Sequence, residues 1–160
     1  MKGQLGAMMR THAQAGRLGW IGLRPERRAS VVAVNAAEVT PAGLTGDHAP
    51  KGKRSVRLIQ AEHLPVIAAL AGLQSVRPEE LRRNLLVADV NLAALRKATI
   101  HIGQVRLQIE GPCPPCSRME EVLGPGGYNA MRGHGGWYAS VVTSGRLSIG
   151  DTVGVARQDF

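Results

Sequence analysis

The sequence is poor in aromatic side chains, in cysteine and in long apolar stretches. Phe, Trp and Tyr together account for 3% of the 160 residues, so a platform that stacks nucleic-acid bases is not expected and the core must be largely aliphatic. The two cysteines lie within residues 113–116 and cannot link distant parts of the fold, which favours a reducing cytoplasm. No stretch approaches the roughly 18 apolar residues that a membrane-spanning helix needs, so we expect no membrane partner.

Acidic side chains are also scarce relative to basic ones. Twelve Asp and Glu oppose twenty Lys and Arg, which gives a formal charge of +8. Such a field favours an anionic partner, for example a phosphate-bearing cofactor, a nucleic acid or an acidic protein surface. A basic surface that only improves solubility is the alternative interpretation. A non-catalytic binding module for nucleic acid or an acidic protein therefore stays open as a function.

Length and periodicity predict a single domain over residues 1–160 that is mainly β. Twenty glycines and nine prolines indicate many turns. Within 104–110, apolar residues alternate with polar ones, as in a strand with one buried face. A helix is predicted over 61–71, where apolar residues recur at helical spacing, and a short helix over 78–81. Further strands are predicted over 17–23, 30–34, 55–60, 84–87, 99–102, 146–149 and 152–155.

Turn signals between the later strands predict two hairpins. One joins 99–102 to 104–110 and the other joins 146–149 to 152–155, each through a glycine followed by a polar residue. No change in composition divides the chain. With many short strands and few short helices, an antiparallel β-barrel or a strongly curved sheet is favoured.

The segment around the two cysteines carries the most chemical information. Cys113 and Cys116 frame two prolines. Ser117 and Glu120 have the spacing of a capping box, and Gly124 would end the helix that the box begins. Cys116 would then lie just before this helix, where unpaired backbone N–H groups favour an anion such as a thiolate or a persulfide. An inert buried cysteine and a thioredoxin-like dithiol are the alternatives, whereas a zinc site would need a second ligand pair.

Four segments resemble, in the same order, motifs of the MOSC domain family, named for the domain at the C-terminus of molybdenum-cofactor sulfurases. They are 43–48 (GLTGDH), 82–88 (RRNLLVA), 111–119 (GPCPPCSRM) and 135–153 (GGWYASVVTSGRLSIGDTV). The match spans nearly the whole chain and is similar to the compact, stand-alone bacterial members. It implies a barrel-like fold and chemistry that involves sulfur or a molybdenum cofactor.

In this resemblance Cys116 takes the place of the family cysteine, which carries a persulfide sulfur or binds the molybdenum of a molybdopterin. Cys113 is an additional thiol, and we expect it to act as a resolving thiol toward a Cys116 persulfide. His48 stands where many members carry an arginine, which weakens the expectation of an ionic contact there. The residues predicted to bind the anionic pterin cofactor are Arg82, Asn84, Asp47, His48, Gly135, Gly136 and Trp137.

We expect a particular role for each of these residues, and an alternative role stands beside those of the glycines, Asp47, His48 and Trp137. Arg82 and Asn84 would hold the phosphate or the pterin edge, and the glycine N–H groups would approach an oxyanion. Asp47 and His48 would orient groups or transfer protons, and Trp137 would form a pocket wall. The alternatives are flexible glycine loops, a turn-stabilising Asp with an exposed His, and a core Trp.

The implied activity is sulfur transfer or molybdenum-dependent reduction, and some small bacterial family members are associated with the reduction of N-hydroxylated bases. The sequence contains no flavin or nicotinamide fingerprint. A reductase would therefore need an electron-transfer protein, and a sulfur carrier would need a sulfur-donor protein. Whether the chain is an enzyme stays open at this level.

Overall fold

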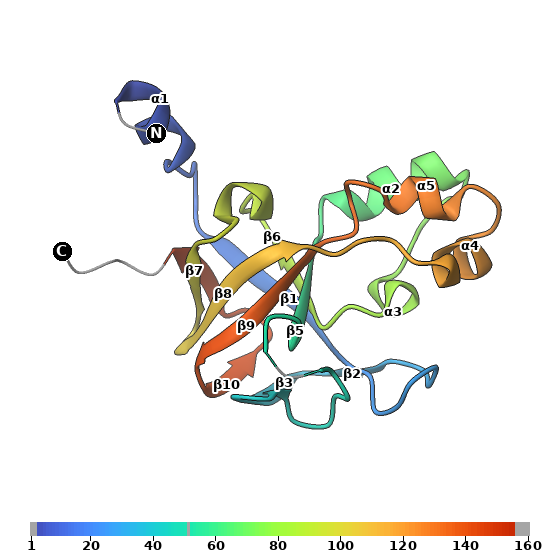
Figure 1. Ribbon diagram of the computed structural model, residues 1–160, viewed down its shortest axis with the longest axis horizontal. Coiled ribbons are helices and arrows are strands. Elements are labelled where there is room, and N and C mark those ends of the chain that lie inside the picture. Colours follow the sequence, from blue (N-terminus) through green and yellow to red (C-terminus); the bar gives the residue numbers. More distant parts are fainter. Residues whose placement is uncertain (1–2, 51, 156–160) are drawn as a thin grey trace.

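The computed structural model describes residues 3–50 and 52–155, and most of its regular elements are strands (Figure 1). The strands are β1 (Gly16–Leu23), β2 (Val32–Val34), β3 (Ala36–Thr40), β4 (Gly43–Leu44), β5 (Val56–Gln60), β6 (Leu85–Ala88), β7 (Thr99–Ile102), β8 (Val105–Pro112), β9 (Trp137–Thr143), β10 (Gly145–Ser148) and β11 (Thr152–Val155). The helices are α1 (Gln4–Met9), α2 (His63–Ala71), α3 (Pro78–Leu81), the 3₁₀ helix η1 (Leu92–Leu95), α4 (Ser117–Leu123) and α5 (Gly127–Met131).

Seven strands close into a barrel. The larger sheet has the order β11-β7-β8-β9-β5-β6-β1-β2, and β11 also pairs with β1, so that β2 remains as an extension outside the ring. All neighbours are antiparallel except β5 and β6, which are parallel because the chain between them crosses over through α2 and α3. A second sheet has the order β10-β3-β4. The predicted mainly β, barrel-like fold is confirmed.

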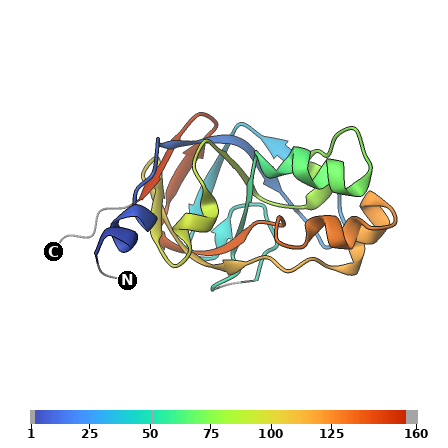
Figure 2. The ribbon, with the colours of Figure 1, turned by 90° about the horizontal axis from the view of Figure 1, so that it is seen from above.

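Side-chain alternation places the core inside this barrel. Val105, Leu107 and Ile109 on β8 are buried, as the periodicity of that strand predicted. Strand β5 is buried on both faces: Leu58 belongs to the barrel core, whereas Ile59 packs into a second cluster with residues of α2, α4 and α5. The helices α2 to α5 therefore gather at one end of the barrel, and α1 lies at the opposite end (Figures 1 and 2).

The two predicted hairpins have different outcomes. Strands β7 and β8 pair as expected, with Ile102 opposite Val105. The second prediction is wrong, because β10 pairs with β3 while β11 pairs with β7 and β1. A tight turn is present between them, where the carboxylate of Asp151 accepts a hydrogen bond from the Ser148 N–H at 2.8 Å. The chain uses this turn to pass from the smaller sheet to the barrel.

Gly136, which precedes β9, is required by the backbone. Its φ is +95°, and a Cβ atom there would lie 2.0 Å from the carbonyl oxygen of Leu58. We expect Gly136→Ala to lower the free energy of unfolding by roughly 2–5 kcal/mol, because left-handed strain and a backbone clash add. Gly72→Ala is the control, since Gly72 has a φ of +72° but open space around it, and strain alone costs about 1–2 kcal/mol. Equal losses in urea denaturation would contradict this account.

Candidate functional site

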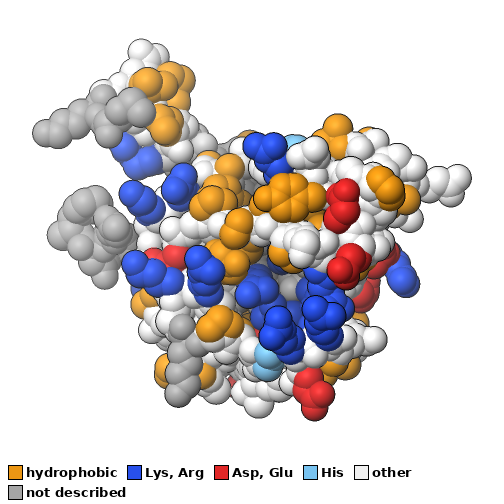
Figure 3. Space-filling model, turned by 45° about the vertical axis from the view of Figure 1, so that its right-hand side comes forward, with side chains coloured by type: hydrophobic (Ala, Val, Ile, Leu, Met, Phe, Trp, Pro, Cys, Tyr) orange, Lys and Arg blue, Asp and Glu red, His pale blue; other side chains and the backbone are white. Residues whose placement is uncertain are grey.

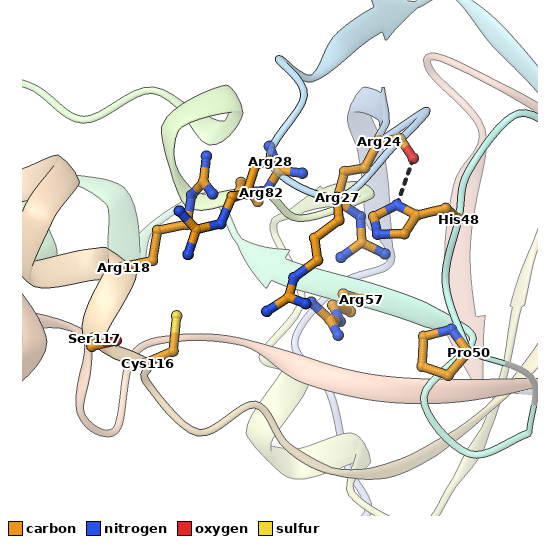
Figure 4. A pocket seen from close by; sticks show the side chains of 10 residues that line it. All are labelled: Arg24, Arg27, Arg28, His48, Pro50, Arg57, Arg82, Cys116, Ser117 and Arg118. Atoms are coloured by element: carbon orange, nitrogen blue, oxygen red, sulfur yellow. Dashed lines mark hydrogen bonds between the residues drawn. The ribbon is translucent and has the colours of Figure 1, made fainter.

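A pocket of about 380 Å³ opens beside the exposed cysteine and is lined mainly by arginine (Figure 4). We call it the arginine pocket. Its lining contains no Asp or Glu, and Figure 3 shows Lys and Arg side chains gathered around a hollow on this face. The lining residues are Arg24, Arg27, Arg28, His48, Pro50, Arg57, Arg82, Cys116, Ser117 and Arg118.

The six arginines come from segments that are far apart in the sequence. Arg24, Arg27 and Arg28 follow β1, Arg57 lies on β5, Arg82 follows α3, and Arg118 lies on α4. Strands β1 and β5 both neighbour β6 in the barrel, and the α3 and α4 segments lie at the same end of it. Barrel closure therefore brings the arginines together. Only Arg82 was predicted as a binding residue, although three of the other arginines lie close together in the sequence, within residues 24–28.

Arg24 and Asp47 form a buried ion pair at the back of this pocket. The side chains are 3% and 0% exposed, and Arg24 Nη2 lies 2.9 Å from Asp47 Oδ2. Asp47 Oδ1 also accepts from the Arg24 backbone N–H at 2.7 Å and from Nε at 3.1 Å. This fork joins the end of β1 to the turn at 45–48. Asp47 is not among the pocket-lining residues, and its observed role is to position Arg24.

His48 does line the pocket, and its hydrogen bonds define its tautomer. The Arg24 carbonyl oxygen lies 2.9 Å from the His48 backbone N and 2.9 Å from its Nδ1 (Figure 4). A carbonyl oxygen only accepts hydrogen bonds, so Nδ1 carries the proton. Nε2 has no hydrogen-bond partner among the described residues.

Five of the six arginines have no carboxylate within ion-pair distance in the described part of the chain. Burial, together with the positive charge of Arg24, lowers the pKa of Arg57. The Nε atoms of Arg57 and Arg118 are buried, and no partner for them exists within residues 3–50 and 52–155. An anion in the pocket would relieve this crowding of like charge and use the free guanidinium donors.

Arg82 lines the pocket and also supports its wall. Its guanidinium donates to the carbonyl oxygens of Ala29 and Glu26, in the loop between β1 and β2. Burial lowers the pKa of Arg82, and the charges of Arg118 and Arg24 act in the same direction. The prediction that Arg82 takes part in binding is compatible with this position.

The two cysteines have opposite environments although only two residues separate them. Cys116 is exposed and lines the arginine pocket, whereas Cys113 is 6% exposed. The Cys113 N–H donates to the Gly136 carbonyl at 2.8 Å, which fixes this end of β8. Burial raises the pKa of the Cys113 thiol, against the opposing effect of Arg83 and Arg57. Cys113 is therefore poorly suited to act as a thiolate nucleophile.

The predicted capping box is wrong, although the helix that it was expected to begin is present as α4. The N-cap residue of α4 is Cys116 itself, Ser117 is the first helical residue, and no side chain caps the helix. The Glu120 carboxylate accepts instead from the backbone N–H groups of Gly126 at 3.2 Å and Tyr128 at 3.0 Å. Glu120 therefore fixes the connection from α4 to α5.

Besides Asp47, four predicted binding residues do not line the arginine pocket. Asn84 is fully buried; its Oδ1 accepts from the Arg57 N–H at 3.0 Å and its Nδ2 donates to the Gly22 carbonyl at 3.1 Å. Asn84 thereby ties β5, β6 and β1 together beneath the pocket. The Gly135 carbonyl accepts from Arg83 Nε at 2.7 Å. The remaining two are Gly136, whose carbonyl binds Cys113, and Trp137, which packs against the barrel core.

Two further observations limit what the described residues can do. No group of three or more His, Cys, Asp or Glu side chains within them could hold a metal ion. No described helix combines the length and apolarity that crossing a membrane requires.

The fold and the site define a small β-barrel domain in which an exposed thiol borders an arginine-lined pocket. A family model described as MOSC domain matches residues 45–154, and the chain belongs to this family. No curated protein matches the sequence.

Solved structures share the fold at low sequence identity. The YuaD protein from Bacillus subtilis is 16% identical, with a TM-score of 0.77 over 88% of this chain and 94% of that one. YiiM from Escherichia coli is 19% identical, with a TM-score of 0.69 over 89% and 71%. YiiM from Geobacillus stearothermophilus is 13% identical, with a TM-score of 0.72 over 89% and 75%. At these identities the likeness shows the fold alone.

The contrast between the two thiols predicts selective alkylation. With iodoacetamide at pH 8, Cys116 should react about tenfold faster than Cys113 or more, because Cys113 is buried and its raised pKa leaves little thiolate. Peptide mass mapping over time measures both rates. In urea the two rates should converge. Equal rates in the native protein would contradict the structure.

The buried ion pair predicts a large cost for removing one charge. Asp47→Asn should lower the free energy of unfolding by about 3–5 kcal/mol, because the buried Arg24 charge loses its partner. Glu38→Gln is the control: it breaks an exposed pair with Arg146 at 3.4 Å and should cost no more than about 1 kcal/mol. Denaturation curves of both variants compare the losses, and similar values would refute the role given to Asp47.

Proposed function

We propose that this protein binds a molybdenum cofactor of the molybdopterin type in the arginine pocket and uses Cys116 as its molybdenum ligand or as a persulfide carrier. The observation that carries the proposal is that the exposed Cys116 lines the same cavity as six arginine side chains. A soft thiolate and a set of phosphate-binding guanidinium groups are the two kinds of donor that such a cofactor requires.

The residues present fit this group. The cavity of about 380 Å³ falls within the range of roughly 300–1,000 Å³ typical of small-molecule sites. Arg27, Arg57 and Arg118, which have no carboxylate partner among the described residues, would hold the phosphate. Cys116 would offer its sulfur as the single protein ligand to molybdenum. The unused buried Nε atoms of Arg57 and Arg118 support an anionic occupant.

When bound, the cofactor would supply two-electron redox chemistry next to Cys116. The chain itself would bind the anion through its arginines, hold the thiolate and exchange a proton at His48 Nε2. Reduction of an N-hydroxylated compound consumes two electrons and two protons and releases water. His48 and solvent would supply the protons, and an electron-transfer protein would supply the electrons.

Sulfur carriage is the second form of the proposal, with the same central residue. Cys116 is exposed, and its thiolate would attack the outer sulfur of a persulfide on a donor protein; the donor's S–S bond breaks, the donor leaves as a thiolate and Cys116 becomes the persulfide. The arginines would stabilise the anionic terminal sulfur. A resolving attack by Cys113 would form a disulfide with Cys116 and release hydrosulfide. The burial and raised pKa of Cys113 disfavour that step, so sulfur would pass to an acceptor outside the chain.

The direct test is Cys116→Ser in protein purified from molybdenum-replete cells. Elemental analysis for molybdenum, assay of pterin phosphate, and intact-mass detection of an adduct of about 32 Da on Cys116 together cover both forms of the proposal. We expect the variant to lose the adduct, or to lose molybdenum by about tenfold or more.

Two variants, Cys113→Ser and Arg146→Gln, serve as controls, and Arg57→Gln tests the arginines. Cys113→Ser removes a buried thiol outside the pocket and should retain the wild-type signal. Arg57→Gln should reduce retention of pterin phosphate, whereas Arg146→Gln, which changes an exposed arginine outside the pocket, should not. Molybdenum, pterin and adduct levels that are unchanged in Cys116→Ser would reject the proposal. Salt-sensitive binding of RNA that ignores Cys116 would instead favour a basic binding module.

A further inference from the structure

Tyr138 on β9 contacts two arginine side chains through the face of its ring. The Cζ atom of Arg54 lies 4.8 Å from the ring centroid, and the Cζ atom of Arg57 lies 5.3 Å from it. Both distances fall within the roughly 6 Å over which an aromatic face attracts a cation. Of the two arginines, only Arg57 lines the arginine pocket, and Figure 4 shows it among the pocket side chains. Tyr138 itself does not line the pocket, so it acts there only through Arg57.

Strand pairing places Tyr138 beside Arg57. Arg57 on β5 and Tyr138 on β9 are directly opposite each other in an antiparallel pair, so both side chains project from the same face of the sheet. On the other side of β9 the partner of Tyr138 is Gly111, which has no side chain to compete for the ring. Asn84 holds the backbone of Arg57: its Oδ1 accepts from the Arg57 N–H at 3.0 Å, and its own N–H donates to the Arg57 carbonyl at 2.8 Å. Asn84 thus fixes the backbone of Arg57, and Tyr138 contacts the end of its side chain.

The Arg57 guanidinium has an aromatic neighbour and no carboxylate partner, unlike that of Arg24. Within residues 3–50 and 52–155 it forms no ion pair, and its buried Nε has no hydrogen-bond partner. Burial lowers the pKa of Arg57, and the charge of Arg24 acts in the same direction, so the positive charge is destabilised there. A carboxylate would offset this by neutralising the charge and occupying the N–H groups. An aromatic face stabilises the cation and leaves both its charge and its N–H donors available.

We infer that Tyr138 is a positioning residue of the arginine pocket, which holds Arg57 by a cation–π contact so that its charge and N–H donors remain available to an anion. As part of cofactor binding this role rests on the proposed function, whereas its effect on anion affinity can be measured without any cofactor. The ring favours binding because Arg57 is already oriented before the anion arrives. Tyr138 acts through Arg57 and takes no part in electron or proton transfer.

The test measures the affinity of the full chain for pyrophosphate by calorimetry at physiological ionic strength. Pyrophosphate is the probe because it offers the anionic phosphate groups of a larger ligand without the organic part. Tyr138→Leu should weaken pyrophosphate binding by about fivefold, because Arg57 loses the contact that orients it. Tyr138→Phe should retain the wild-type affinity to within about twofold, since the face of the ring remains.

Arg54→Gln is the matched control. Arg54 contacts the same ring but lies outside the arginine pocket, so its replacement should change pyrophosphate affinity by less than about twofold. Arg57→Gln should weaken binding by about tenfold. In the Arg57→Gln background, Tyr138→Leu should have no further effect, because the tyrosine acts through Arg57. Equal weakening by Tyr138→Leu in both backgrounds would indicate a merely structural role and overturn the inference.

A second replacement preserves the shape of the ring in case Tyr138→Leu does not fold. Tyr138→trifluorophenylalanine fills nearly the same space as Tyr138→Phe, but the face of its ring carries a weaker negative potential. Relative to Tyr138→Phe, it should weaken pyrophosphate binding by about threefold. Equal affinities of these two variants would overturn the inference, as would wild-type affinity in Tyr138→Leu.

The outcome is separable from that of the proposed function. Pyrophosphate binding that depends on Tyr138, in a protein that retains no molybdenum, pterin or sulfur adduct, would overturn the proposed function and keep the role of Tyr138 in an anion site. Retention of molybdenum and pterin, with pyrophosphate affinity that is indifferent to Tyr138, would overturn the inference alone. Wild-type protein that does not bind pyrophosphate would also overturn the inference, and Cys116→Ser would still decide the proposed function.

Discussion

The buried ion pair between Arg24 and Asp47 is the constraint on which the site depends. Both charges are removed from water, a cost that only the forked hydrogen bonds and the added backbone N–H bond offset. The pair holds the turn at 45–48 against the end of β1. The Arg24 carbonyl can then receive both hydrogen bonds from His48. One contact thus sets the pocket wall and the tautomer of its histidine.

The other five arginines of the arginine pocket are held close together and have no carboxylate partner in the described part of the chain. The repulsion between their positive charges destabilises the folded state. The barrel tolerates this because its core is continuous and because Asn84 and Arg82 hold the elements that carry the arginines. A ligand that neutralises the pocket would recover this free energy as binding and as added stability. Electrostatic strain of this kind is typical of functional sites rather than of structural ion pairs.

The proposed roles of the thiols follow from where β8 ends and α4 begins. The strand carries Cys113 into the interior, and the next turn of chain exposes Cys116 at the pocket. One exposed thiol results, with the second thiol protected by burial.

The sequence alone determined the features that depend on local periodicity and motifs. These are the alternating strand predicted within 104–110, the helix predicted over 61–71 and found over 63–71, the presence of a helix soon after Cys116, and the family itself. It could not determine strand partners, because alternation reports which face is buried and not which strand lies alongside; hence the error over β10 and β11. The sequence also could not predict the arginine pocket, because its arginines lie on separate segments that only barrel closure brings together. Asn84 matched a family motif, yet tertiary structure placed its amide between strands, because a buried polar group must find hydrogen-bond partners.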